Sequence, residues 1–132
     1  MKLTELIMGM PITVEIVDSN ATELEIKKIF SYFKVVDQIF STYKEDSEIS
    51  KINRGEIKPE DYSSEIREVF LLAEKTKNDT NGYFDIKHNN KIDPSGLVKG
   101  WAIKQAADIL TQQGFINFYV EAGGDIQTGK SG

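Results

Sequence analysis

The chain has 132 residues, which is enough for one domain with a hydrophobic core and short for two. Its composition, 39% hydrophobic and 28% charged, is typical of a soluble globular protein. A net charge of -5 without a lysine- and arginine-rich stripe argues against nucleic-acid binding, and no apolar run is long enough to span a membrane. Without cysteine, disulfides, thiolate metal sites and a lipid anchor on cysteine are excluded.

The first half of the chain is predicted to form a strand and three helices. Residues 12–17 alternate and contain β-branched side chains, which indicates a strand. A turn at residues 18–20 (Asp18, Ser19, Asn20) can cap a long amphipathic helix over residues 22–41. Its apolar face is formed by Ile26, Ile29, Phe30, Phe33, Val36 (or Val35), Ile39 and Phe40.

Two further helices follow. A short one is expected at residues 47–53, capped by Asp46 or Ser47 and ended by Arg54-Gly55. The next is expected at residues 63–78, capped by Ser63 or Ser64, with its inward face formed by Ile66, Val69, Phe70, Leu72 and Ala73.

The second half mixes strands with one more helix. Residues 78–86 indicate a turn followed by a short strand, and a helix after Gly96 should end at Gly114, a favourable residue just past a helix end. Residues 117–121 indicate a strand that Gly123-Gly124 interrupts before a strand begins again. Because strands and helices do not alternate regularly, the predicted class is α+β, a mixed or antiparallel sheet with helices packed on it.

The segment from Asp93 to Leu110 carries the first indication of function. Pro94, Ser95 and Gly96 favour a turn, so Asp93 and Lys99 should flank the start of a helix. Free backbone N–H groups and the helix dipole attract anions there, and a phosphate or pyrophosphate is the natural ligand. An ordinary loop–helix junction explains the same local pattern.

Five short motifs in order make the sequence resemble the ApbE family of FAD:protein FMN transferases. They occur at Met8-Gly9-Met10, from Ser41-Thr42-Tyr43 to Asn53 through Asp46-Ser47-Glu48, at Phe84-Asp85-Ile86, from Asp93 to Gly100, and from Ala122 to Asp125. Each motif is unspecific by itself, but their common order spans most of the chain. The resemblance implies an ApbE-like fold, related to the T-fold.

The resemblance also implies an activity. The FMN moiety of FAD would be transferred to a threonine or serine hydroxyl of an acceptor protein, with AMP as the leaving group and Mg²⁺ as cofactor. No complex with nucleic acid and no membrane span is expected. The alternatives are a non-catalytic flavin- or nucleotide-binding module and a fragment that associates with a complementary chain.

The resemblance carries over FAD-binding roles by position, and it assigns no catalytic residue. The FAD-binding positions are Met8, Tyr43, Tyr83, Phe84, Asp85, Asp93 and Lys99, and the backbone carbonyl of Gly96 is expected to bind the metal. Local features alone would also allow a core methionine at Met8, an interfacial tyrosine at Tyr43 and a buried strand at residues 83–85. Ser47, Glu48 and Asn53 are interpreted as a helix cap, an acid at a helix start and a residue that closes a turn.

Two departures from the family pattern stand out. Met10 replaces the usual threonine of Met-Gly-Thr, and only residues 87–92 separate Ile86 from Asp93, where longer relatives carry several tens of residues.

The family's remaining metal ligands and a histidine-containing segment would lie after Gly132. Residues 1–132 are therefore expected to be the N-terminal part of one ApbE-like domain, with a complementary C-terminal fragment as a possible partner. With no leader or lipid-anchor cysteine in view, a cytoplasmic location or a trimmed exported form is expected.

Overall fold

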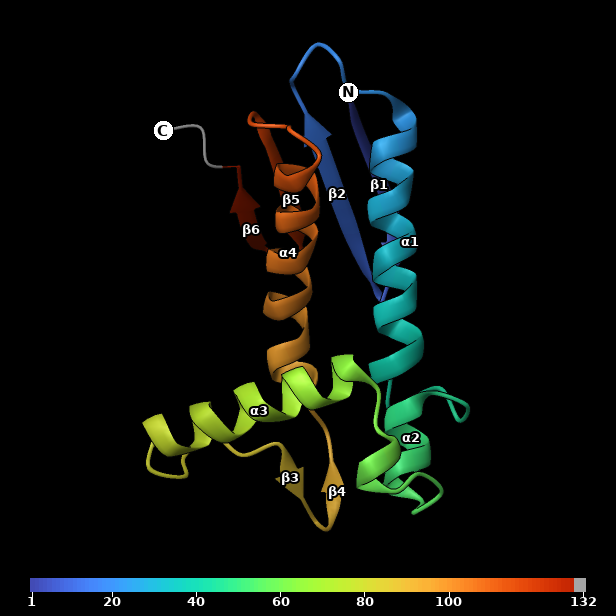
Figure 1. Cartoon of the computed structure of the whole chain (residues 1–132), viewed down its shortest axis with the longest axis vertical. Helices are drawn as coiled ribbons and strands as arrows, with labels where there is room; N and C mark the ends of the chain where they lie inside the picture. The colour runs from blue at the N-terminus through green and yellow to red at the C-terminus, as the bar shows by residue number, and fades with distance from the viewer. Residues whose placement is uncertain (130–132) are drawn as a thin grey trace. The chain divides into compact units, whose positions relative to one another are not determined.

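The computed structural model describes residues 1–129 and confirms a mixed α+β architecture (Figure 1). None of the helices in this part of the chain is both long and apolar enough to cross a membrane. In chain order the elements are β1 (Lys2–Ile7), β2 (Met10–Ile16), α1 (Glu23–Phe40), α2 (Glu48–Asn53), the 3₁₀ helix η1 (Pro59–Asp61), α3 (Ser64–Asp79), β3 (Lys87–His88), β4 (Lys91–Ile92), α4 (Ser95–Gln112), β5 (Phe118–Ala122) and β6 (Asp125–Thr128).

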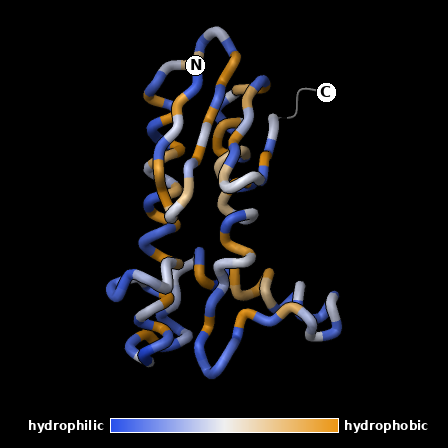
Figure 2. Tube along the Cα trace, turned by 180° about the vertical axis from the view of Figure 1, so that it is seen from behind, coloured by the Kyte–Doolittle hydropathy of each residue, from blue (hydrophilic) through white to orange (hydrophobic). Residues whose placement is uncertain are grey.

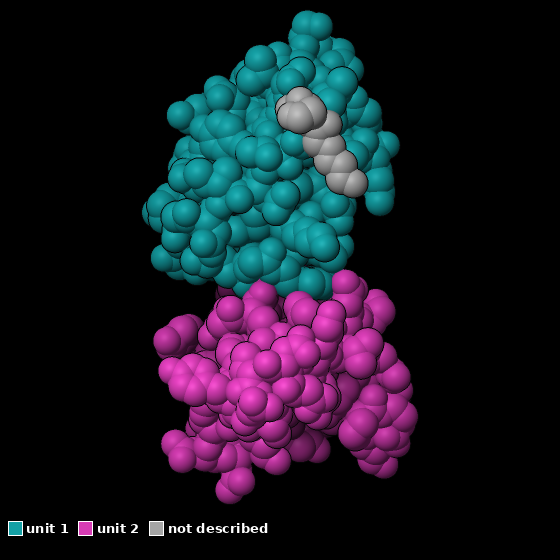
Figure 3. Space-filling model, turned by 90° about the vertical axis from the view of Figure 1, so that its left-hand side faces the viewer, with its two compact units in different colours: residues 1–35, 99–132 teal, residues 36–98 magenta. Residues whose placement is uncertain are grey.

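The chain divides into two compact units (Figure 3). Unit 1 consists of residues 1–35 and 99–132, and unit 2 consists of residues 36–98. Unit 1 is therefore built from both ends of the sequence, and unit 2 from its middle.

Unit 1 contains a four-stranded antiparallel sheet with the order β1-β2-β5-β6. The two central strands pair Ile12 with Ala122, Val14 with Val120 and Ile16 with Phe118, and all six side chains are buried. Because side chains alternate across a strand, these residues form one apolar face. On the opposite face the hydroxyls of Thr4 and Thr13 lie 2.8 Å apart.

Two helices cover the apolar face of this sheet. Figures 1 and 2 show, from opposite sides, that the unit 1 parts of α1 and α4 lie on the same side of the strands. Their buried residues include Ile26, Ile29, Phe30 and Phe33 on α1 and Ala102, Ile103, Ala106 and Leu110 on α4. The predicted core face of α1 is confirmed, since Val36 is buried whereas Val35 is exposed.

The N-terminus of α1 differs from the prediction. The Glu25 carboxylate accepts the backbone N–H and the hydroxyl of Thr22, and the first of these contacts is one half of a capping box. The same contacts lower the pKa of Glu25, with the Thr22 hydroxyl contributing most. Asp18, predicted as part of the capping turn, instead accepts the backbone N–H groups of Ile116 and Asn117 just before β5. Sequence spacing could not reveal a partner so distant along the chain.

Unit 2 is mainly helical and has a core of its own. Its buried side chains come from the end of α1, from α2 and α3 and from the first turn of α4, and include Val36, Phe40, Ile49, Ile52, Ile66, Val69, Ala73 and Val98. The predicted caps are confirmed in part: Ser47 caps α2 and Ser63 caps α3, each by accepting a backbone N–H three residues ahead. Gly55, with a φ of 76°, follows the end of α2.

The predicted strand at residues 83–86 is wrong. Strand pairing begins only at Lys87, where β3 and β4 form a two-residue hairpin around Asn89 and Asn90. Both asparagines have positive φ, 52° and 64°, which two-residue hairpin loops favour. The apolar content of Tyr83-Phe84 suggested a strand, but neither residue has a strand partner here.

Candidate functional site

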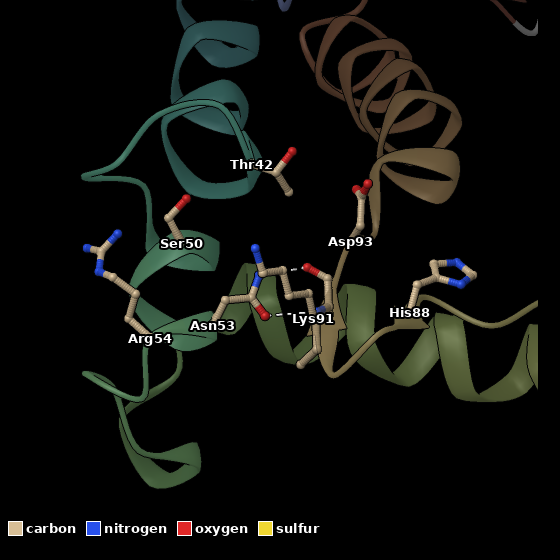
Figure 4. A pocket seen from close by; sticks show the side chains of 8 residues that line it. Thr42, Ser50, Asn53, Arg54, His88, Lys91 and Asp93 are labelled. Carbon is tan, nitrogen blue, oxygen red and sulfur yellow. Dashed lines mark hydrogen bonds between the residues drawn. The ribbon is translucent and has the colours of Figure 1, made fainter.

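Unit 2 contains a polar hollow of about 440 Å³ at the hairpin β3–β4 (Figure 4). This volume falls within the range of small-molecule sites. The predicted site residue Asp93 belongs to its lining, which is formed by Thr42, Ser50, Asn53, Arg54, His88, Lys91, Ile92 and Asp93. The lining residues thus include hydroxyl, amide, basic and carboxylate side chains, although Figure 4 shows Arg54 and His88 directed to opposite sides.

Asp93 is exposed, yet hydrogen bonds hold it and the preceding residue, Ile92, at three points. Its backbone N–H donates to the carbonyl of Ile86 at 2.7 Å, which extends the β3–β4 ladder by one residue. One of its carboxylate oxygens, Oδ1, accepts the backbone N–H of Ser95, the first residue of α4, at 3.1 Å. The other carboxylate oxygen accepts no hydrogen bond from residues 1–129 and can accept one from a ligand.

The third point of attachment comes from Asn53, the last residue of α2. Its side-chain nitrogen donates to the carbonyl of Ile92 at 2.8 Å, and its oxygen accepts the backbone N–H of Ile92 at 2.8 Å (Figure 4). The prediction that Asn53 closes a turn is therefore wrong, because its amide forms hydrogen bonds with the backbone of Ile92, 39 residues away in sequence.

The two other motif residues read as structural keep that role. Ser47 is fully buried, and its hydroxyl donates to the carbonyl of Ser41 at 2.6 Å while it caps α2. Glu48 lies in the first turn of α2, as predicted, and accepts the backbone N–H of Ser63 at 2.8 Å. This hydrogen bond ties α2 to the start of α3.

The basic groups of the hollow differ in availability. The Arg54 side chain pairs with Glu56 at 2.5 Å, and this hydrogen bond raises the pKa of Arg54 and lowers the pKa of Glu56. Lys91 makes no ion pair within the described part of the chain, and it lies opposite His88 in the hairpin register. Lys91 is therefore the cation of this hollow that remains open to an anionic ligand.

The predicted aromatic contacts occupy two environments. Tyr43 and Tyr83 are 97% and 95% exposed, so both rings are free to stack on a ligand. Phe84 is half-buried, and a Cβ built on Gly96 would lie 3.7 Å from its ring atom Cε2. Asp85 accepts the backbone N–H of Lys87 and pairs with Lys77; these contacts, the Lys87 N–H first, lower the pKa of Asp85.

The residues described do not by themselves fit a magnesium ion. Gly96 lies in the first turn of α4 and would offer a single carbonyl oxygen. Residues 1–129 contain no group of three or more histidine, cysteine, aspartate or glutamate side chains arranged to hold a metal. Magnesium requires six oxygen ligands in near-octahedral geometry and gives up its waters reluctantly. One carbonyl cannot meet that requirement.

Unit 1 brings together a second set of predicted residues. Lys99 lies just beyond the first turn of α4, which begins at Ser95, so Asp93 and Lys99 flank the start of the helix as predicted. Its ammonium contacts the Asp125 carboxylate at 3.0 Å and the carbonyl of Gly123 at 3.4 Å. A Cβ on Gly123 would lie 3.1 Å from the Met10 sulfur and 3.3 Å from the Lys99 nitrogen. A side chain at this turn would have to adopt left-handed backbone, since φ is 55°, and the ends of both flexible side chains would have to shift by a few tenths of an ångström.

Met8 occupies an unusual backbone position. It forms with Gly9 the two-residue loop between β1 and β2, and both residues have positive φ, 59° and 73°. Left-handed backbone costs about 1 kcal/mol or more in a residue with a Cβ, and such residues gather at functional sites. As at Asn89 and Asn90, a two-residue hairpin loop itself calls for positive φ at both positions, so the β1–β2 turn accounts for the backbone of Met8 and its role toward FAD stays a prediction.

Comparisons with known proteins were made for sequence and structure. The sequence model of the ApbE family matches residues 8–90 and 86–132. No curated protein matches the sequence significantly.

Three solved structures share the fold. The flavin transferase ApbE of Vibrio cholerae superposes with a TM-score of 0.88 at 20% identity, over 98% of this chain and 59% of that protein. The apo flavinyl transferase ApbE of Pseudomonas stutzeri gives 0.85 at 18% identity, over 96% and 60%. The ApbE protein of Thermotoga maritima gives 0.76 at 22% identity, over 96% and 58%. The chain thus spans about three fifths of the length of these similar proteins.

Proposed function

Since the chain belongs to the ApbE family, we propose that it acts as an FAD:protein FMN transferase. In this reaction the hydroxyl oxygen of a threonine or serine on an acceptor protein attacks the phosphorus of the FMN half of FAD. A new phosphoester bond forms, the pyrophosphate bond to AMP breaks, and AMP leaves with the electron pair. The hydroxyl proton passes to a base that the residues described do not identify.

The observation that carries the proposal is the fixed carboxylate of Asp93 beside the polar hollow. One oxygen is engaged at the start of α4 and the other is open, so a ligand hydroxyl or amine meets an acceptor already in position. We propose that Asp93 accepts hydrogen bonds from the ribose or adenine part of FAD. Lys91, which has no ion-pair partner within residues 1–129, adds a positive charge to the same hollow.

The remaining predicted residues receive roles on chemical grounds. Met8, Tyr43, Tyr83, Phe84 and Asp85 are proposed to contact FAD, with the two exposed tyrosine rings available for stacking. Lys99 is proposed to balance negative charge on the pyrophosphate, where charge develops as the bond to AMP breaks.

We propose that the transfer depends on Mg²⁺. A bound magnesium would neutralise phosphate charge, and the Gly96 carbonyl would contribute one ligand. The other ligands would come from outside residues 1–129, either from a complementary polypeptide or from further residues of one ApbE-like domain of which residues 1–132 are the N-terminal part. A cytoplasmic location and a flavoprotein acceptor complete the proposal.

One observation favours a second function, a flavin- or nucleotide-binding module without transfer. Within residues 1–129 the hollow is formed, and so is the Lys99 cluster, by which we mean Lys99 with Asp125 and the carbonyl of Gly123. No group of acidic or histidine side chains in this part of the chain could hold a metal. In this second function, FAD would be bound by the hollow and by the Lys99 cluster, without a metal.

A single experiment separates these functions. The 132-residue chain, supplemented with a polypeptide that supplies the remaining metal ligands, is incubated with FAD, Mg²⁺ and an acceptor protein containing a reactive threonine, and the acceptor is analysed by intact mass spectrometry. A mass gain equal to the FMN phosphoester, with AMP released, supports transfer. Flavin retained on the chain without any gain on the acceptor supports the binding module. If no flavin binds at all, both functions are ruled out.

A further inference from the structure

Asn53 makes a contact that a helix-ending residue does not need. α2 already ends through the backbone, because the N–H of Arg54 donates to the carbonyls of its last turn and Gly55 follows with a positive φ. The Asn53 side chain turns away from α2 toward β4 and forms two hydrogen bonds of 2.8 Å to a single residue, Ile92 (Figure 4). An amide group that donates to the C=O and accepts from the N–H of one residue makes the same pair of hydrogen bonds as a residue of a neighbouring antiparallel strand.

The contact between Asn53 and Ile92 helps to fix the position of the next residue, Asp93. β4 is only two residues long, and β3 is its strand partner. Asn53 occupies the hydrogen-bonding groups of Ile92, the N–H of Asp93 donates to Ile86, and the Asp93 carboxylate accepts from Ser95. The main chain on both sides of the Asp93 side chain is thus fixed, although the side chain itself is exposed.

We propose that Asn53 is a positioning residue, which holds β4 so that the open carboxylate oxygen of Asp93 faces its ligand. This role depends on the proposed function, because it assigns to Asp93 the binding of FAD. A purely structural clamp would have no reason to affect ligand affinity through Asp93. A positioning clamp loses its effect on affinity once Asp93 is removed.

That difference can be measured as a double-mutant cycle on the full 132-residue chain. Affinity for FAD is determined by flavin fluorescence for the wild type, Asn53→Ala, Asp93→Ala and the double variant. We expect each single variant to bind FAD about tenfold more weakly and the double variant to bind no more weakly than Asp93→Ala alone. Independent effects would multiply to about a hundredfold loss, and that result overturns the proposal.

A second variant covers the case in which Asn53→Ala does not fold. Asn53→Asp keeps the size and the acceptor oxygen but replaces the donor with a carboxylate oxygen that faces the Ile92 carbonyl, so it should weaken FAD binding as well. Asn78→Asp makes the same chemical change at an exposed position of α3 in the same unit and should leave affinity unchanged. Equal losses in the two variants would show a general charge effect and contradict the proposal.

A measurement without nucleotide tests the Asn53–Ile92 contact separately from FAD binding. Hydrogen exchange of the Ile92 amide, followed by NMR, should be slow in the wild type and at least about tenfold faster in Asn53→Ala, because the accepting oxygen is gone. Unchanged exchange shows that no clamp exists. If the clamp is present and the wild type binds no FAD, the proposed function fails and the positioning role falls with it. If the wild type binds FAD and the cycle is additive, only the positioning role fails.

Discussion

Lys99 is an ammonium shared between two oxygen acceptors of one hairpin. The Asp125 carboxylate and the carbonyl of Gly123 lie 3.0 and 3.4 Å from its nitrogen, and the lysine side chain is 33% exposed. An ammonium has three donors, so one remains for a phosphate. Asp125 therefore directs Lys99 while lowering the net positive charge that an anionic ligand meets.

The first prediction concerns this pair. Asp125→Asn removes one negative charge about 3 Å from Lys99, and two charges 4 Å apart interact by about 1 kcal/mol in water. We expect FAD to bind about twofold to fivefold more tightly at low salt, with the gain lost in 0.5 M salt. Lys99→Ala should instead weaken binding without lowering the melting temperature.

Fluorescence titration of FAD at two salt concentrations checks this prediction. Glu5→Gln provides the matched control, since it breaks the Lys34–Glu5 ion pair of unit 1, 2.7 Å long, with the same change of net charge. Equal tightening in both variants would trace the effect to overall charge and not to Lys99.

Met8 carries the second prediction. Met8→Gly relieves left-handed strain in the β1–β2 loop but adds flexibility to the unfolded chain, so stability should change by less than about 1 kcal/mol. FAD affinity should fall because the side chain proposed to contact the flavin is missing. Leu6→Ala, which truncates an exposed apolar residue of the same hairpin, should leave affinity unchanged. Urea denaturation and FAD titration measure the two effects, and an unchanged affinity for Met8→Gly would remove Met8 from the site.

At the scale of an element, the start of α2 depends on one buried hydroxyl. Ser47 caps the helix and donates to the carbonyl of Ser41, and it is fully buried. Ser47→Ala should lower the free energy of unfolding by about 1–3 kcal/mol, because a cap is lost and a carbonyl loses its donor. Ser31→Ala, at an exposed site inside α1, should cost no stability. Urea denaturation provides the measurement; a loss below about 0.5 kcal/mol for Ser47→Ala would contradict the role given to this hydroxyl.

Elements with strong periodicity could be predicted from sequence, and those defined by distant partners could not. The buried face of α1 follows from the spacing of Ile26, Ile29, Phe30 and Phe33 alone. β1 escaped prediction because its three apolar residues do not alternate with the polar ones and its strand character comes from pairing with β2. The opposite error occurred at residues 83–86, where apolar residues suggested a strand but the structure has no strand for them to pair with.

The same division holds for the candidate site. Motifs pointed to Asp93 and Lys99, and the structure surrounds both with fixed polar groups. The Asn53–Ile92 clamp and the Asp18 contact to the loop before β5 could not be predicted, because they join residues far apart in sequence. Hydrogen bonds between a side-chain amide and a distant backbone segment produce no periodic pattern in the sequence.

At the scale of the whole molecule, binding of flavin and binding of metal should be separable. Residues 1–129 contain no acidic or histidine group that fits a metal, yet the hollow at Asp93 is formed. We expect Mg²⁺ alone at millimolar concentration to give no binding heat in calorimetry with the 132-residue chain. FAD affinity should change less than about threefold on adding EDTA, since that is under 1 kcal/mol. Tight binding of Mg²⁺ to the free chain would contradict this reading of the site.

The discontinuous unit 1 has a consequence for how the chain is made. Its central strands pair Ile16 with Phe118, whereas residues 36–98 have their own core. At the usual speed of translation, about 5–20 residues per second, the N-terminal hairpin leaves the ribosome ~5–20 s before β5 follows. During that interval the apolar side of β2 lacks its strand partner β5, and a nascent chain in this state is the form most exposed to aggregation and most in need of a chaperone.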